Sequence, residues 1–528
     1  MSESKPVFVL GFDGVPWNLV EKWTASGDLP NLARIVDEGA TGPLESTTPA
    51  TTPLAWPSIA TGVRPDKHGS YWFRELQSDY THRVRTSDRI RGPMLWDLLS
   101  PAAVANVPMT YPAREIDGVV VSGMMTPENR QGFTFPPELA TDIDERIPGY
   151  EIGLTWGEYD GSTSALHEDL RALVENCRDL MRLLLERAEW RLTFFVYTFP
   201  DRLQHLVWEE DVLREYYARM DDIVGEAMEY VEERDGTLYV VSDHGFGPIE
   251  KTVSVNAALA DAGLLGRRDD AGVRGSLSRL GVTKTGVLGA LDRVGVDEST
   301  LVRYLPDAVT DRVASQIPGE HVLYDVDYDT TSAFAYGPGH VYVNDTERFD
   351  RGTVDPDDRK AVARDARVAL EAITDPDTGE RVLDVFDGTD IFPTDPDAPD
   401  LAVEPREGYE AVTSLREDAV APATKMNASH RPEGIFLAWG PDVDAGSVPA
   451  DASVYDVTPT VLHAAGEPVP DRVDGRVLDE IFAPGSPPAE TDVRTTDYDD
   501  TDGDTASGEG RDDFDDVEDR LRGLGYID

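Results

Sequence analysis

The stretch PVFVLGFDG at residues 6–14 decides the fold class that the sequence predicts. Its apolar run has no polar residue on either face, which is typical of a strand buried on both sides in a parallel sheet. The run ends at Asp13-Gly14, where the chain turns. In open parallel sheets, ligands bind just outside the carboxyl ends of the strands. We therefore expect an α/β fold with a polar site at the sheet edge where Asp13 lies.

Two further predicted strands end in the same way. The run Leu192–Phe199 leads into Pro200-Asp201, and Thr237–Ser242 is followed at once by Asp243-His244. A single acidic residue after a strand more often caps a helix or forms a turn. Three of them at one sheet edge are placed to converge, so we interpret all three as candidate ligands.

The segments around these strands have the periodicity of helices. A long amphipathic helix is predicted over Ser164–Arg191, with leucines at helical spacing, and a second helix over Tyr216–Glu233. Further helices are predicted over 19–38, 94–99, 359–373 and 456–465, and further strands over 42–46, 118–122, 331–344 (a pair) and 435–439. Residues 123–162 carry many Gly and Pro and predict loops over the core, and residues 386–412 are turn-rich.

The chain divides into four parts by composition. Residues 1–262 and 326–482 hold the predicted strands and form the two parts of one core. Residues 263–325 have Gly-, Arg- and Asp-rich turns and lack a clear buried strand, so we interpret them as an inserted cap beside the site. Residues 483–528 are rich in Pro, Asp, Thr and Gly, which predicts a disordered acidic tail with a short helix near its end.

The charge of the chain is extreme. It has 101 Asp and Glu against 48 Lys and Arg, a formal net charge of −53. Such a surface repels itself where the Debye length is about 10 Å, at 0.1 M salt, and is screened where it is about 3 Å, at 1 M. We interpret the acidity as a halophilic adaptation to a salty cytoplasm. It argues against a stable complex with nucleic acid, which needs a basic surface.

Cysteine content and the lengths of the apolar runs indicate in which cellular compartment the protein works. Cys177 is the one cysteine, which excludes intramolecular disulfides and a Cys-based zinc cluster. The first residues run straight into the predicted strand and leave no room for a signal peptide. No apolar run approaches the roughly 18 residues of a membrane-spanning helix. We therefore expect a cytoplasmic protein without a transmembrane segment.

A hydroxyl-rich stretch at residues 47–69, TTPATTPLAWPSIATGVRPDKHG, precedes and includes a predicted helix. A threonine just before a helix faces free N–H groups and the positive end of the helix dipole. Most such residues cap the helix, and the same position also suits a nucleophile that faces a phosphate. Thr51 and Thr52 are the two candidates. We interpret His68 as fixing the turn before Gly69 rather than binding a metal.

Seven side chains form the candidate ligand set: Asp13, Thr52, Asp201, His205, Asp243, His244 and His430. Asp201 and His205 are four residues apart, so in a helical turn both project to one side. Carboxylate and imidazole ligands without sulfur suit zinc, manganese or iron. Seven ligands exceed the needs of one tetrahedral ion and fit two ions about 4 Å apart, the arrangement used for in-line displacement at phosphorus.

In this order, the motifs resemble the type I phosphodiesterase/nucleotide pyrophosphatase family of the alkaline phosphatase superfamily. They are GFDG at 11–14, the run from Thr52 to TGVRPDKHG at 61–69, PDRLQH at 200–205, SDHGFG at 242–247 and SHRPEGIF at 429–436. The resemblance implies a three-layer α/β/α sandwich with a mostly parallel central sheet. It also implies a metal-dependent phosphodiesterase or pyrophosphatase that acts on a small nucleotide or nucleotide-sugar-like substrate. The alternatives are a phosphomonoesterase or phosphomutase of the same superfamily, or a non-catalytic protein that binds a phosphate ligand.

The resemblance also assigns roles to the candidate residues. Thr52 would be the nucleophile and form a phospho-threonine intermediate; it is favoured over Thr51 because it directly precedes Pro53. Two divalent ions are implied, zinc at both positions in most of the family, with manganese as the alternative. One ion would be held by Asp201, His205 and His430, and the other by Asp13, Asp243, His244 and Thr52.

Overall fold

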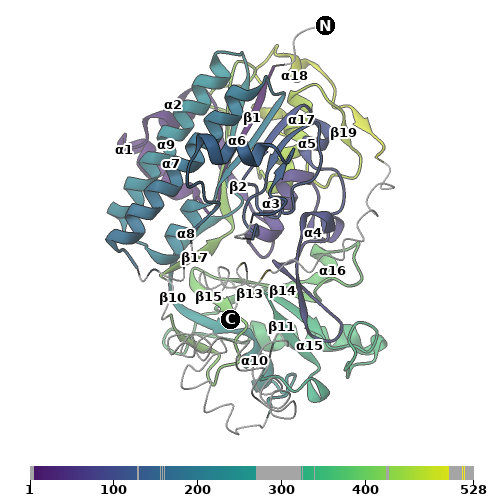
Figure 1. The fold of residues 1–528 in the computed structure, drawn as a ribbon. Coiled ribbons are helices and arrows are strands. Elements are labelled where there is room, and N and C mark those ends of the chain that lie inside the picture. Colours follow the sequence, from purple (N-terminus) through teal and green to yellow (C-terminus); the bar gives the residue numbers. More distant parts are fainter. Residues whose placement is uncertain are drawn as a thin grey trace, which may run out of the picture.

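The computed structural model describes residues 5–127, 130–154, 156, 159, 161–268, 323, 325–337, 339–423, 427–498, 514 and 517. Figure 1 shows a large region built on a central sheet and, below it in that view, a smaller region with a sheet of its own. Most of the predicted insertion at 263–325 and most of the predicted tail helix lie outside the described residues.

The central sheet of the large region is mostly parallel, as predicted. Its eight strands, in their order across the sheet, are β2 (Ala40–Glu45), β18 (Glu433–Trp439), β9 (Thr237–Val241), β1 (Val7–Phe12), β8 (Leu192–Tyr197), β5 (Ala102–Ala105), β6 (Gly118–Val121) and β7 (Thr134–Phe135). The strands from β9 to β6 are parallel, whereas β2, β18 and β7 pair antiparallel at the two edges. Gly11 pairs with both Val196 and Val241, so the three central strands end level.

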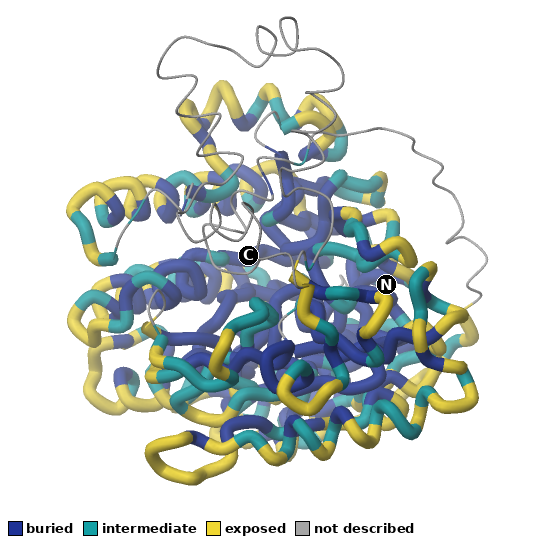
Figure 2. The backbone as a smooth tube through the Cα atoms, turned by 90° about the horizontal axis from the view of Figure 1, so that it is seen from below, coloured by how far each residue is buried: buried dark blue, intermediate teal, exposed yellow. Residues whose placement is uncertain are grey.

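Helices cover both faces of this sheet. The alternation of β1 divides its side chains, since Phe8, Leu10 and Phe12 join one apolar cluster and Val7 and Val9 join the other. The first cluster lies under α1 (Trp17–Ser26), α2 (Pro30–Glu38), α6 (Leu139–Arg146), α7 (Ser164–Arg187) and α9 (Glu210–Glu232), and the second under α3 (Thr52–Thr61), α5 (Leu95–Leu98) and α17 (Val457–Ala464). In Figure 2 the buried backbone runs through the middle of the molecule and exposed turns lie outside it. The predicted three-layer α/β/α architecture is confirmed.

The small region is built on a four-stranded antiparallel sheet. Its strands, in order, are β11 (Ala333–Tyr336), β12 (His340–Val343), β14 (Leu401–Pro405) and β13 (Leu383–Asp387), and it packs against α10 (Val255–Asp261) and α15 (Arg359–Glu371). A hairpin of β3 (Arg74–Leu76) and β4 (His82–Val84) extends from the large region to it (Figure 1). Trp72, Phe73 and Tyr80 of this hairpin segment lie in one apolar cluster with Phe334. The two regions therefore share a core.

One long strand connects the two regions. β10 (Gly245–Ser254) begins directly after the Asp243-His244 motif and pairs with β15 (Gly408–Val412), β16 (Val420–Pro422) and β17 (Ala428–Arg431). In this ladder Phe246 lies opposite His430. The chain thus returns from the small region to the carboxyl edge of the central sheet.

Short elements complete the fold. They are α4 (Pro65–His68), α8 (Phe199–Leu206), α16 (Gly388–Ile391), α18 (Pro487–Glu490), the strands β19 (Val469–Pro470) and β20 (Thr495–Thr496), and single 3-10 turns at Ser87–Arg89, Tyr328–Thr330, Pro356–Asp358, Val454–Asp456 and Asp479–Ile481. None of the helices in the described ranges combines the length and the apolar character that crossing a bilayer demands.

Two local predictions are wrong, and one turn-rich segment holds strands. Residues 123–162, predicted as loops, hold β7 and α6, and the turn-rich residues 386–412 hold β14 and β15. These strands are short and lie among Pro, Gly and Asp residues, so turn signals hid their alternation. The predicted disordered tail begins at residue 483, yet within residues 483–498 α18 forms and β20 pairs with β19, with Thr495 opposite Val469.

Candidate active site and metal centre

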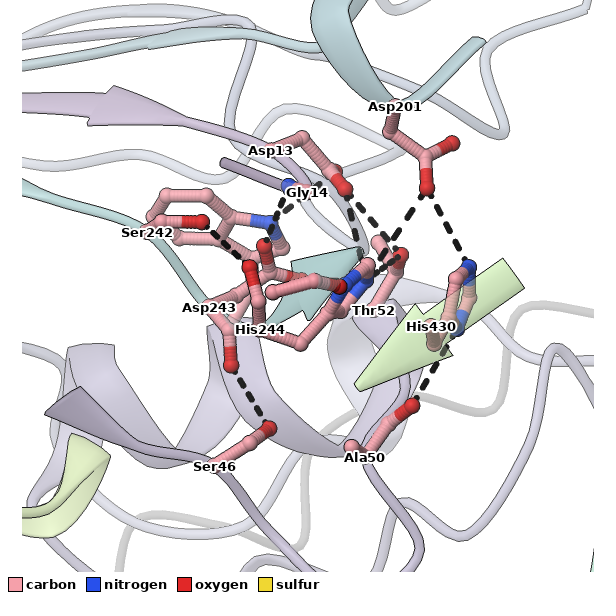
Figure 3. A network of polar contacts seen from close by, with 12 residues as sticks. Asp13, Gly14, Ser46, Ala50, Thr52, Asp201, Ser242, Asp243, His244 and His430 are labelled. Carbon is pink, nitrogen blue, oxygen red and sulfur yellow. Dashed lines mark hydrogen bonds and ion pairs between the residues drawn. The ribbon is translucent and has the colours of Figure 1, made fainter. Parts of the chain in front are cut away.

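The level ends of the three central strands bring the acidic motifs together. Asp13 follows β1, Asp201 lies in the first turn of α8 after β8, and the pair Asp243-His244 follows β9. β9, β1 and β8 are neighbours in the sheet, so these side chains converge at one edge. His430 joins them from β17 (Figure 3). The structure places all seven predicted residues in one buried cluster.

The first group of donors consists of Asp201, His205 and His430. His430 Nε2 lies 3.1 Å from Asp201 Oδ1 and 3.1 Å from His205 Nε2. His205 Nε2 lies 3.5 Å from the same carboxylate oxygen. Asp201 and His205 project to one side of α8, as their spacing predicts.

The second group consists of Asp13, Asp243, His244 and Thr52. His244 Nε2 lies 3.3 Å from Asp243 Oδ2 and 3.6 Å from Asp13 Oδ1. Thr52 Oγ1 lies 3.3 Å from the same nitrogen and 3.4 Å from Asp13 Oδ1. The threonine hydroxyl is therefore part of the second group.

The two groups adjoin through His244. Its Nε2 lies 4.0 Å from Asp201 Oδ1, and the His244 and His430 rings stack with centroids 3.9 Å apart. Donor atoms of Asp201, His244 and His430 lie within 4.8 Å of one another, and so do those of Asp13, Asp243 and His244. Each set is compact enough for one ion.

Backbone carbonyls fix the tautomers of the histidines. His430 Nδ1 lies 3.1 Å from the Ala50 carbonyl oxygen, and His244 Nδ1 lies 3.0 Å from that of Gly245. A carbonyl oxygen only accepts, so Nδ1 carries the proton and the Nε2 lone pairs of His244 and His430 face the carboxylates. Metal-binding histidines are held in this way.

The buried carboxyl groups of the cluster favour the binding of a cation. Burial, and then the Asp201 charge, raise the pKa of Asp13 to about 7, and burial raises the pKa of Asp243 well above its ordinary value. Burial lowers the pKa of His205 to about 3. Asp243 Oδ2 is buried and has no hydrogen-bond partner among the described residues. Buried carboxylates in this number are costly without a cation, so the donor set and the orphaned oxygen fit a divalent ion.

The start of α3 distinguishes the two threonines. Thr52 is the first residue of α3 and directs Oγ1 to Asp13 and His244. Thr51 occupies the N-cap position, but its side chain makes no capping bond, and its buried Oγ1 has no partner in the described part of the chain. Trp56, one turn further along α3, donates from Nε1 to Asp13 Oδ2 at 3.1 Å. Of the two hydroxyls, that of Thr52 is the one that lies in the ligand cluster.

Several residues around the ligands were not predicted. Arg202 is buried beside its neighbour Asp201, with Nη1 3.4 Å from Asp201 Oδ2. Glu404 of β14 accepts a hydrogen bond from the Ala50 N–H at 3.1 Å, so the small region contacts the threonine-rich segment just before α3. Arg202 follows a motif residue directly, a signal that sequence reasoning could have used. The Glu404 contact spans 354 residues of sequence and has no local signal.

His68 lies outside the ligand cluster, as its position in the turn predicts. Its Nδ1 accepts the Ser70 N–H at 3.1 Å, and its Nε2 lies 3.0 Å from Ser58 Oγ. The ring therefore fixes the turn before Gly69, whose φ of 81° is left-handed.

Solved structures resemble this fold at low sequence identity. Phosphonoacetate hydrolase from Sinorhizobium meliloti 1021, in complex with phosphonoacetate, matches with a TM-score of 0.51 and 15% identity over 88% of this chain and 96% of that chain. Its complex with phosphonoformate matches with a TM-score of 0.52 at the same identity and coverage. Human ectonucleotide pyrophosphatase/phosphodiesterase 5 matches with a TM-score of 0.49 and 12% identity over 90% of this chain and 100% of that chain. No curated protein matches the sequence.

A family model matches most of the chain. The model described as type I phosphodiesterase/nucleotide pyrophosphatase covers residues 7–434, from the start of β1 into β18. This range includes the three strand-end motifs, the threonine-rich segment before α3 and His430. The chain therefore belongs to the type I phosphodiesterase/nucleotide pyrophosphatase family of the alkaline phosphatase superfamily and is a phosphoester hydrolase.

Proposed function

We propose that the protein is a metal-dependent phosphodiesterase or nucleotide pyrophosphatase that works through a phospho-threonine at Thr52. The observation that carries this proposal is the position of Thr52 Oγ1, which lies 3.4 Å from Asp13 Oδ1 and 3.3 Å from His244 Nε2 in a buried cluster of acids and imidazoles. A hydroxyl used only for capping would face the free N–H groups of its own helix instead.

Two divalent ions, zinc or manganese, fit the donors. Asp201, His205 and His430 would hold one ion, and Asp13, Asp243, His244 and Thr52 the other. Such a pair activates the nucleophile and stabilises the attacking and leaving oxygens of an in-line displacement. The two groups of donors adjoin, since Asp201 Oδ1 and His244 Nε2 lie 4.0 Å apart, and would hold the two ions side by side.

The residues of the chain perform the remaining steps. Thr52 Oγ forms a bond to phosphorus while the bond from phosphorus to the leaving-group oxygen breaks. Asp13 Oδ1, the hydrogen-bond acceptor of the hydroxyl, is positioned to take its proton. The N-terminus of α3 presents its dipole and the Thr52 N–H to the phosphate oxygens. The oxygen of a water molecule then bonds to phosphorus, the bond between Thr52 Oγ and phosphorus breaks, a proton returns to Thr52 Oγ, and the phosphomonoester product is released.

Substrate comparison tests this proposal. Zinc- or manganese-loaded protein in high salt is assayed with a chromogenic phosphodiester and the matching monoester. Dinucleotides, nucleotide sugars and phosphonoacetate are then assayed in parallel. We expect the diester or pyrophosphate to be hydrolysed faster than the monoester, with nucleotide-like compounds best. A faster monoester would favour a phosphomonoesterase or phosphomutase, and phosphate binding without turnover would favour a non-catalytic protein.

The composition supports a proposal about the working environment. The formal net charge of −53 suits a cytoplasm of high salt, where the repulsion between surface carboxylates is screened. We propose that the partner of this protein is a small phosphoester and that nucleic acid is not bound stably, because an acidic surface repels the phosphate backbone.

A further inference from the structure

Gln204 lies in α8 between the two candidate ligands Asp201 and His205, and its side chain is fully buried. Its amide Nε2 donates to the carbonyl oxygen of Gly14 at 2.6 Å, and its Oε1 accepts from the hydroxyl of Tyr217 at 3.0 Å. The reversed amide would place Oε1 against the Gly14 carbonyl, where two acceptors meet, so the contacts define its orientation. Gln204 thus links α8, which carries Asp201 and His205 of the first group, to the turn at Gly14, which follows Asp13 of the second group.

Gly14 carries this connection onward to a ligand of the second group. Its N–H donates to Asp243 Oδ1 at 3.2 Å, while its carbonyl receives the Gln204 amide. The residue has a φ of 73°, and a Cβ added there would lie 2.9 Å from Asp201 Cβ. The Gly14 backbone therefore fills the space between Asp201 and Asp243, and a chain of hydrogen bonds runs from Tyr217 through Gln204 and Gly14 to Asp243.

The hydrogen-bonded groups of Tyr217, Gln204 and Gly14 are uncharged, so they add no charge beside the three buried carboxylates. Burial raises the pKa of Tyr217 well above its ordinary value, so the phenol stays protonated and remains a donor. A buried amide is costly unless both its ends are paired, and here both ends are. A charged residue at position 204 would instead alter the balance between the acids and the cations they bind.

We propose that Gln204 is a positioning residue that sets the separation between the two groups of ligands, and that loss of its bond to Gly14 weakens cation binding by the second group. The inference rests on the proposed function only in that the two groups bind divalent ions. Displacement at phosphorus needs the two ions about 4 Å apart, so a fixed spacing has a chemical purpose. Some residues hydrogen-bond to metal ligands without binding the metal themselves, and their substitution typically weakens metal affinity by about 10- to 100-fold.

The test is a calorimetric titration of the metal-stripped, full-length protein with Zn²⁺ in high salt. We expect wild type to bind two ions. Gln204→Met, similar in length but unable to donate, should weaken one binding event by about 10- to 100-fold and leave the other nearly unchanged. Tyr217→Phe removes only a hydroxyl and keeps the ring packed on Trp23, so it should weaken the same event by roughly two- to tenfold, the effect of one hydrogen bond.

Leu203→Ala is the matched control. Leu203 is the buried apolar neighbour of Gln204 in α8, so its truncation lowers thermal stability without removing a hydrogen bond. The expected result is a lower melting temperature with the wild-type Zn²⁺ isotherm. The inference is overturned if Gln204→Met and Tyr217→Phe both bind as wild type, if Leu203→Ala weakens Zn²⁺ binding as much, or if wild type binds fewer than two ions. Two bound ions without phosphoester turnover would defeat the proposed function and leave this inference intact.

Discussion

The Nε2 atoms of His205 and His430 lie 3.1 Å apart, beside the carboxylate of Asp201. His430 donates its Nδ1 proton to the Ala50 carbonyl, so its Nε2 lone pair would face the other imidazole unless a positive charge lies between them. Burial lowers the pKa of His430, but the hydrogen bond to Asp201 and the charges of Asp201, Glu410 and Asp13 together raise it, so the site favours a positive charge there. A divalent ion can supply that charge. Cation binding at this position should therefore stabilise the folded protein as well as support catalysis.

Chelation is therefore expected to lower both activity and the free energy of unfolding. A ligand present at 100 times its dissociation constant stabilises the folded state by about 2.7 kcal/mol. We expect thermal unfolding in a chelator to occur at a lower temperature than in excess Zn²⁺, and Zn²⁺ added back to restore both properties. His430→Ala is the control, since its unfolding should respond less to Zn²⁺. Full turnover after exhaustive chelation would contradict metal dependence.

The two neighbouring threonines give a direct test of the nucleophile. Thr52→Ala removes the hydroxyl that faces Asp13 and His244, and kcat should fall by at least about 10³-fold, as when other enzymes lose a nucleophile. Thr51→Ala removes a hydroxyl that makes no hydrogen bond among the described residues, so kcat should change by less than about tenfold. Mass spectrometry of protein acid-quenched during turnover of a diester should find on Thr52 a phosphoryl group that still carries the retained ester group. Phosphate on Thr51, or an active Thr52→Ala, would reverse the assignment.

Arg202 is expected to stabilise the metal-free protein. It is a buried cation beside Asp201 Oδ2, and removal of one partner from a buried ion pair costs about 3–5 kcal/mol. Arg202→Met should therefore lower the free energy of unfolding by an amount of this order, measured with urea in a chelator. Excess Zn²⁺ should recover part of the loss, because it also neutralises the carboxylates. Arg214→Met, at an exposed pair with Asp211, is the control and should cost less than about 1 kcal/mol.

The strand-end motifs were predictable from sequence because each lies next to a strong local signal. β1, β8 and β9 are apolar on both faces, and an acidic residue follows each. Parallel strands end at one edge, so convergence of Asp13, Asp201 and Asp243 follows from topology alone. The helices α7 and α9 have a clear helical period for the same reason: one of their faces is buried against the sheet.

Other features depend on contacts between distant residues. His430 reaches the cluster because β17 pairs with β10, a ladder that no periodicity in either strand indicates. Glu404 contacts Ala50, and Gln204 contacts Gly14, across 354 and 190 residues of sequence. Short strands such as β14 and β15 lie among turn-forming residues, so their alternation is too brief to stand out. The choice between Thr51 and Thr52 likewise depends on side-chain direction.

A buried histidine predicts how stability changes with pH. Burial, and then the charge of Arg85, lower the pKa of His68 to about 3, and its Nδ1 accepts the Ser70 N–H. Because the folded pKa lies below the unfolded value of 6.5, the neutral ring's contribution is complete above pH 6.5 and is lost as the pH falls toward 3. Over that window this residue should cost about 1.4 kcal/mol per pH unit.

His68→Asn tests that contribution. The asparagine oxygen can still accept the Ser70 N–H but does not titrate, so the variant should be less stable at pH 7 and lose less stability on acidification. Urea unfolding between pH 7 and pH 4.5 gives the two slopes. His82→Asn, at a half-buried position of the β3–β4 hairpin, is the comparison. Parallel pH profiles for wild type and His68→Asn would show that folding leaves the pKa of the ring unchanged.

The acidic surface predicts a dependence on salt whose cause can be separated by substitution. At a net charge of −53, repulsion between surface carboxylates should lower the melting temperature in dilute buffer, and KCl should raise it until screening saturates near about 1 M, where the Debye length is about 3 Å. Glu145, Asp261 and Asp418 are exposed, and the three together can be neutralised as Glu145→Gln, Asp261→Asn and Asp418→Asn. If repulsion is the cause, this variant melts above wild type at 0.1 M KCl and the gain disappears at high KCl, because the charges it removes are then already screened.

An equal gain at both salt concentrations would instead indicate local effects of the substitutions. A melting temperature that continues to rise equally for both proteins beyond about 1 M would indicate exclusion of salt from the protein surface rather than screening.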